Sequence, residues 1–127
     1  MLYDFSDFFQ NDNGVLLDNF LDKYTSHLNL DGSDDALLSG YYKNILDMFN
    51  KPFELEEILL LFENLAKHEV SLEYPYVIIT NEIYSLKSML IDQIILADVN
   101  SNIFEFLSLF NKINNRIANI YLNEYTN

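Results

Sequence analysis

The 127-residue chain has no cysteine and no tryptophan, only three glycines and two prolines, and few basic residues. Without cysteine there is no disulfide, no thiolate nucleophile and no zinc site built on cysteine. Scarce glycine and proline indicate few turns and long elements between them. Seven basic residues against 20 acidic ones give a formal net charge of −13. Because such a surface repels phosphate groups, we expect no direct binding to nucleic acid or to an anionic membrane.

Apolar residues, in contrast, are abundant. Half of the residues are hydrophobic, with ten phenylalanines and nine tyrosines, which is ample material for a packed core. The length predicts a single domain over residues 1–127. No apolar run reaches the length of a membrane-spanning helix, and the opening MLYDFSDFF lacks the basic residues of a signal peptide. We therefore expect a cytoplasmic protein without membrane insertion.

Apolar residues recur at helical spacing along most of the chain. The pattern predicts long helices over Asp34–Phe49, Phe53–Lys67, Pro75–Leu96 and Ile103–Tyr125, preceded by a helix over Val15–Leu28 and a short helix or docking arm over Met1–Gln10. The segment VIIT favours a strand locally but lies inside a longer helical pattern, so we assign it to the helix. The predicted fold class is all-α, a bundle of five to six helices.

One histidine lies on an apolar helix face. His68 follows Leu65 by three residues and Leu61 by seven, so the three side chains share one face. A neutral imidazole in such a place suits an axial ligand of haem iron, which makes His68 the candidate for the proximal ligand and for binding a metal. The alternative is a histidine at the edge of the core, bonded to a backbone carbonyl.

Two further residues are candidates for the opposite side of a haem pocket. Tyr24 and His27 are three residues apart and share a helical face, so they could face His68 from the distal side. The alternative is that both are amphipathic residues at a helix surface.

The carboxylates show no pairing that predicts acid–base catalysis. Glu54, Glu57 and Glu63 are typical of a solvated helix face, and we expect Glu82, near Lys87, to face solvent as well. The sequence has no Glu-x-x-His pair for a di-iron site, no glycine-rich phosphate loop and no nucleophile-elbow motif. We therefore assign no catalytic residue and expect this chain not to be an enzyme.

The segment LAKHEVSLEYPYVIITNEIYSLKSML resembles the proximal-histidine region of globin-coupled sensors, the globin-like N-terminal domains of bacterial diguanylate cyclases and chemotaxis receptors. The shared features are a histidine late in one helix, a bend with proline, and a long helix with a Leu-Lys pair, here His68, Pro75 and Leu86-Lys87. The resemblance implies a globin-like sensory domain of a bacterial signalling protein. It further implies that His68 is the proximal haem ligand, that Tyr24 is the nearest match to a distal tyrosine, and that an output domain such as a cyclic-dinucleotide enzyme follows.

Surplus apolar surface predicts a homodimer. The helix Pro75–Leu96 carries more apolar positions than one core face needs, and Ile103–Tyr125 carries a heptad-like seam from Phe106 to Ile120. We expect two copies to meet through these helices, and the last helix to continue into the output domain. Two alternatives stay open: a non-haem helical module for dimerisation or protein interaction, and a small acidic inhibitor of a nucleic-acid enzyme.

Overall fold

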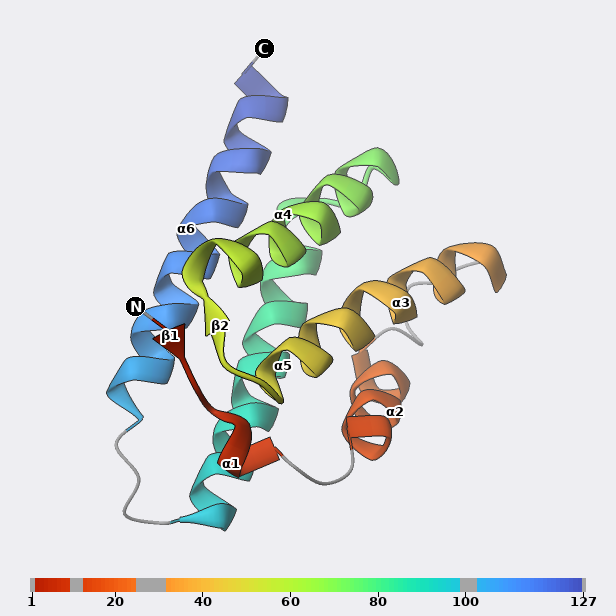
Figure 1. Cartoon of the computed structure of the whole chain (residues 1–127). Coiled ribbons are helices and arrows are strands. Elements are labelled where there is room, and N and C mark those ends of the chain that lie inside the picture. Colours follow the sequence, from red (N-terminus) through yellow and green to blue (C-terminus); the bar gives the residue numbers. More distant parts are fainter. Residues whose placement is uncertain (1, 10–12, 25–31, 99–102, 127) are drawn as a thin grey trace.

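The structure is a computed structural model that describes residues 2–9, 13–24, 32–98 and 103–126 (Figure 1). In chain order the elements are β1 (Leu2–Tyr3), α1 (Ser6–Phe9), α2 (Asn13–Tyr24), α3 (Gly32–Phe49), β2 (Phe53–Glu54), α4 (Leu55–Ser71), α5 (Tyr76–Ala97) and α6 (Phe104–Thr126). The predicted all-α fold of five to six helices is confirmed, and the VIIT segment is helical as expected. None of the helices in these ranges combines the length and apolarity needed to cross a membrane.

The four long helices surround the centre of the domain. Helix α4 packs along α6 and against α3, and α5 contacts α6 from the far side of the view in Figure 1. Helix α2 lies at the outer edge, against α3 and α5, and α1 packs against α5. Helices α3, α4, α5 and α6 thus form a chain of packed neighbours, in which α4 lies between α3 and α6 and α6 lies between α4 and α5.

The start of α4 corrects one prediction. Phe53 and Glu54, expected in a helix, form strand β2, which pairs antiparallel with β1. Phe53 is fully buried and stacks on Tyr3 with ring centroids 5.7 Å apart. The strand pairing thus lets both rings enter the core, and α4 begins only at Leu55, with the Glu54 N–H donating to the Glu57 carboxylate at 2.8 Å.

The N-terminal arm carries aromatic rings into the core. They join an aromatic cluster with α3, β2 and α6, made of Tyr3, Phe5, Phe9, Phe49, Phe53, Phe106 and Phe110. Phe5, for example, meets Phe106 edge to face at 5.3 Å. Such ring pairs add about 0.5–1.5 kcal/mol each beyond the area they bury, so the arm is part of the core.

The seam of α6 is also used inside the chain. Phe106, Phe110, Ile113 and Ile117 are all at most 1% exposed. The heptad-like pattern therefore reports packing within the domain, largely against α4. The last residue of the seam, Ile120, is partly buried, and the homodimer itself stays a prediction.

Helix α4 ends in a Schellman motif without glycine. The Tyr74 N–H donates to the carbonyl of Glu69 at 3.1 Å, and the Glu73 N–H donates to that of Val70 at 2.9 Å. Glu73 takes the left-handed conformation, with φ of 61°. The motif ends the helix at Ser71, so His68 and Glu69 lie in its last turn.

Candidate functional site

Four helices each place one titratable side chain at a common point in the core. Tyr42 comes from α3, Glu69 from α4, Glu82 from α5 and Tyr121 from α6, and each is at most 2% exposed. Tyr121 lies close enough to act on the pKa of Tyr42, as do both carboxyl groups. We call this group the carboxyl cluster.

Hydrogen bonds join the members of the cluster. The Tyr42 hydroxyl donates to Oε1 of Glu82 at 2.7 Å. The carboxyl groups of Glu69 and Glu82 lie within hydrogen-bonding range of each other. Apart from the two carboxyl groups themselves, no donor from the described part of the chain reaches either oxygen of Glu69 or Oε2 of Glu82. Since two carboxylates contain no donor, one of the two groups must keep its proton for the bond between them to form.

The pKa values agree with a retained proton. Burial, reinforced by the charge of Glu82, raises the pKa of Glu69 to about 10. Burial raises the pKa of Glu82 as well, but the hydrogen bonds from Glu69 and Tyr42 oppose that rise. Glu69 is therefore the protonated partner at neutral pH and Glu82 the acceptor of two hydrogen bonds. Burial, followed by the Glu82 charge, raises the pKa of Tyr42 well above its ordinary value, which keeps its hydroxyl a donor.

His68 lies beside the cluster on the same interface between α3 and α4. Its ring is partly buried and contacts the Tyr41 ring, with centroids 5.1 Å apart and planes at 35°. Consecutive residues of α3 thus lie near consecutive residues of α4. Tyr41 contacts His68, and Tyr42 lies close enough to Glu69 for the carboxyl charge to act on its pKa. The Nε2 of His68 is buried without a hydrogen-bond partner among the described residues.

The other residues predicted for a haem pocket cannot be placed around His68. His27 lies outside the described residues, and so does the side chain of Tyr24, the last residue of α2. What the structure places against the imidazole is Tyr41. Nε2 is a suitable donor atom for haem iron, but a planar group between α3 and α4 would have to displace the Tyr41 ring.

The prediction for Glu82 was wrong. Glu82 is 2% exposed and faces the core, while Lys87, which we expected near it, lies over the Tyr84 ring at 5.5 Å. The spacing along the helix already indicated that Glu82 faces the core, since it lies three residues after Ile79 and four before Leu86, both fully buried.

Sequence reasoning missed Glu69 altogether. It follows Leu65 by four residues and Phe62 by seven, so it continues the same apolar face of α4. An acid on an apolar face was the available signal. Such a position indicates a carboxyl group that faces the core, although only the fold could show that Glu82 lies opposite.

The comparisons with known proteins do not extend this picture: no protein-family model, curated protein or solved structure matches the chain. Within the described residues, no group of three or more histidine, aspartate or glutamate side chains is arranged to hold a metal ion. The interpretation of the site therefore depends on its own geometry.

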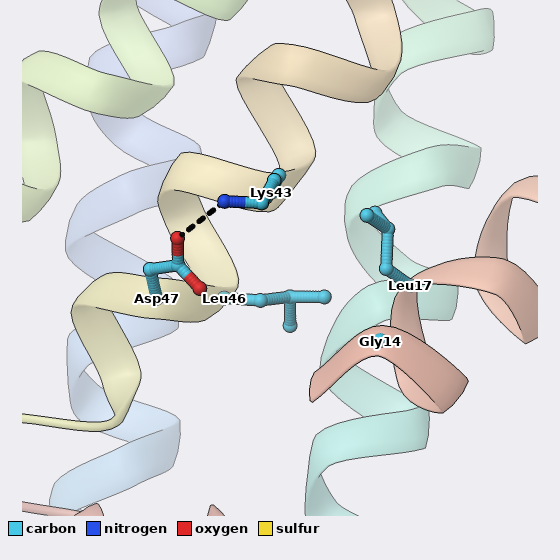
Figure 2. Close-up of a pocket in the computed structure, with 5 residues that line it drawn as sticks. All are labelled: Gly14, Leu17, Lys43, Leu46 and Asp47. Carbon is cyan, nitrogen blue, oxygen red and sulfur yellow. Dashed lines mark hydrogen bonds and ion pairs between the residues drawn. The ribbon is translucent and has the colours of Figure 1, made fainter. Parts of the chain in front are cut away.

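Two pockets flank α2. A small one of about 50 Å³ lies toward α3, where Leu17 and Gly14 face Leu46 and the ion pair of Lys43 with Asp47, whose charged atoms are 3.2 Å apart (Figure 2). A larger one of about 250 Å³ lies between α2 and α5. Only the second has room for more than a few water molecules, each of which takes about 30 Å³ in the liquid.

Proposed function

We propose that this chain is a sensory or regulatory domain of a signalling protein that receives its signal at the interface of α3 and α4. The supporting observation is the buried Nε2 of His68, which has no partner among the described residues and lies next to the carboxyl cluster. A buried polar atom without a partner costs about 1–3 kcal/mol, so a ligand that bonds to it recovers free energy that the protein alone does not.

The route from input to helix packing is short. A group bound to His68 must move Tyr41, because the two rings are in contact. Tyr41 and His68 each precede a member of the carboxyl cluster in sequence, and the cluster ties α3, α4 and α5 together through hydrogen bonds. A movement of the imidazole is therefore passed to the residues next to the carboxyl cluster, which links α3, α4 and α5. A local change of this kind biases helix packing in a switch.

Haem is the group that we propose for this position, as the resemblance to globin-coupled sensors implies. His68 would hold the iron through Nε2, and the haem when bound would supply sensitivity to a gas or to redox state. The chain itself supplies the donor atom and, through Leu61 and Leu65 on the same face, apolar surroundings.

Absorption spectroscopy tests this proposal directly. The purified protein is mixed with hemin, and we expect a Soret band that is lost in His68→Ala and kept, with at most a shift, in His27→Ala. Circular dichroism verifies that both variants are folded. A wild-type protein without a Soret band rejects haem, and a band that persists in folded His68→Ala removes His68 as the ligand.

A second candidate function, a helical interaction module that forms a homodimer, is supported by a different surface. An open, mostly apolar groove of about 370 Å³ lies where α5 begins and α6 ends, lined by Tyr76, Ala118, Asn119, Tyr121 and Leu122. Both helices are those for which the sequence predicts a homodimer. Leu122 is 59% exposed and the neighbouring Val77 is 57% exposed, so apolar surface is available there.

A further inference from the structure

The larger pocket beside α2 has the lining of a binding site. Its polar groups are Asn19 from α2 and Ser85, Ser88, Asp92 and Gln93 from α5. These side chains offer hydroxyl, amide and carboxylate groups. Those on α5 are spread over about two turns of the helix. They are turned toward a shared volume of about 250 Å³, slightly below that of a typical pocket for a drug-sized ligand.

The remaining lining residues are apolar, and one of them is buried in the core. Leu16, Phe20 and Met89 complete the pocket, and Phe20 is only 1% exposed. The Phe20 ring lies 4.5 Å from the ring of Tyr42, whose hydroxyl holds Glu82. The apolar part of the pocket thus rests on a side chain that the carboxyl cluster holds in place.

Charge decides which ligand such a pocket would take. Among the described residues that line it, one carries a carboxylate, the exposed Asp92, and none is lysine, arginine or histidine. The whole chain carries a formal charge of −13, which raises the local concentration of cations and lowers that of anions. An apolar wall on one side and a carboxylate with neutral hydrogen-bonding groups on the other match a small amphipathic cation.

We propose that the pocket between α2 and α5 binds a small organic amine, with its ammonium group at Asp92 and its apolar body against Phe20 and Met89. The neutral groups Asn19 and Ser88 are placed to accept further ammonium hydrogens or to bond a second polar group of the ligand. This site lies on α2 and α5 and does not depend on haem, so its test is separate from that of the proposed function. Phe20, which lines the pocket, contacts Tyr42, so one side chain separates the bound amine from the carboxyl cluster.

A series of three probes with one apolar body tests the assignment. 2-Phenylethylamine, 2-phenylethanol and phenylacetate carry an ammonium, a hydroxyl and a carboxylate on similar scaffolds. Each is titrated into ¹⁵N-labelled protein and followed by NMR. We expect the amine to shift the amides of Ser88, Met89 and Asp92, the alcohol to bind at least several-fold more weakly, and the acid to leave these signals in place.

Two variants identify the carboxylate that matters. Asp92→Asn should weaken binding of the amine by about tenfold, the effect of losing one charge-assisted hydrogen bond. Asp18→Asn, an exposed residue of α2 outside the pocket, removes the same charge and should leave the affinity nearly unchanged. Equal binding of all three probes, shifts that map to another surface, or an unchanged affinity in Asp92→Asn would each overturn the proposal.

Discussion

The hydroxyl of Tyr42 donates a hydrogen bond to the carboxyl group of Glu82, 40 positions further along the sequence, at 2.7 Å and with both residues buried. This contact ties α3 to α5, and the bond from Glu69 adds α4. A buried carboxylate that accepts two hydrogen bonds is far less costly than an isolated one, because desolvation is offset by the donors. The cluster therefore stabilises one arrangement of the helices only while its hydrogen bonds stay intact.

Removal of the tyrosine hydroxyl should expose this dependence. Tyr42→Phe keeps the ring and its contact with Phe20 but leaves Oε1 of Glu82 without its donor. We expect the free energy of unfolding at neutral pH to fall by about 1–3 kcal/mol, the cost of a buried acceptor that has lost its partner. Urea denaturation followed by circular dichroism measures it.

The matched control is Tyr84→Phe on α5, whose side chain is 66% exposed. This change should stay within about 0.5 kcal/mol of wild type, as surface substitutions do. Equal effects of the two substitutions would mean that the Tyr42–Glu82 bond contributes nothing to stability.

The proton on Glu69 predicts an unusual dependence of stability on pH. Below the ordinary glutamate pKa of 4.5, both the folded and the unfolded chain hold this proton. Between that value and the folded pKa of about 10, the unfolded chain releases the proton and the folded chain keeps it. Since the unfolded state then binds fewer protons, the free energy of unfolding falls as the pH rises, by at most about 1.4 kcal/mol per pH unit.

Glu69→Gln separates this effect from the repulsion among the other acids, because the amide is neutral at every pH. Relative to wild type, the variant should gain stability between pH 5 and pH 8, on the order of 4 kcal/mol at about 1.4 kcal/mol per pH unit. Glu63→Gln on the same helix removes a partly exposed carboxylate and should show no such trend. A wild-type-minus-variant difference that is flat from pH 5 to pH 8 would show that Glu69 is ionised in the folded protein.

The helices were easier to predict from the sequence than the residues of the candidate site. Helical periodicity located all four long helices because their buried residues recur every three or four positions, as in Ile79, Ile83, Leu86 and Leu90. The two-residue strand at Phe53 was not predictable, since it exists only through its partner strand near the N-terminus. A tertiary contact there overrides the local helical pattern.

The carboxyl cluster was hidden for a related reason. Glu69 and Glu82 both occupy positions of the apolar pattern, but a single acid in such a position is usually solvated or displaced toward the surface. Burial becomes tolerable only because α3 and α5 bring Tyr42 and a second carboxyl group within hydrogen-bond reach. This pairing is a property of the fold, and no spacing along the chain encodes it.

The end of α4 offers a substitution that should stabilise the protein. Glu73 takes a left-handed conformation that brings its Cβ close to the backbone and that glycine adopts without this cost. Glu73→Gly should raise the free energy of unfolding by about 0.5–1 kcal/mol, after allowance for the greater freedom of glycine in the unfolded chain. Glu73→Ala removes the same charge but keeps the Cβ, so thermal denaturation should show no comparable gain. Equal stabilisation by alanine and glycine would assign the effect to charge instead of backbone conformation.

The proposed homodimer is best tested at the groove formed by the start of α5 and the end of α6. The seam residues Ile113 and Ile117 are unsuitable targets, because both are buried and an acid there would unfold the domain. Leu122 lines the groove and is 59% exposed, so Leu122→Glu leaves the core intact. If two copies pack through this groove, the substitution buries a charge in the interface and should separate them.

Light scattering at micromolar concentration then gives the answer. We expect the wild type to have about twice the chain mass of 14.9 kDa and Leu122→Glu to have the mass of one chain. Phe104→Glu is the matched control, since Phe104 is 77% exposed at the opposite end of the same helix. It introduces an equal charge on α6 outside the groove and should stay dimeric. A wild type with the mass of one chain rejects the dimer, and a dimer that both variants retain places the interface elsewhere than the groove.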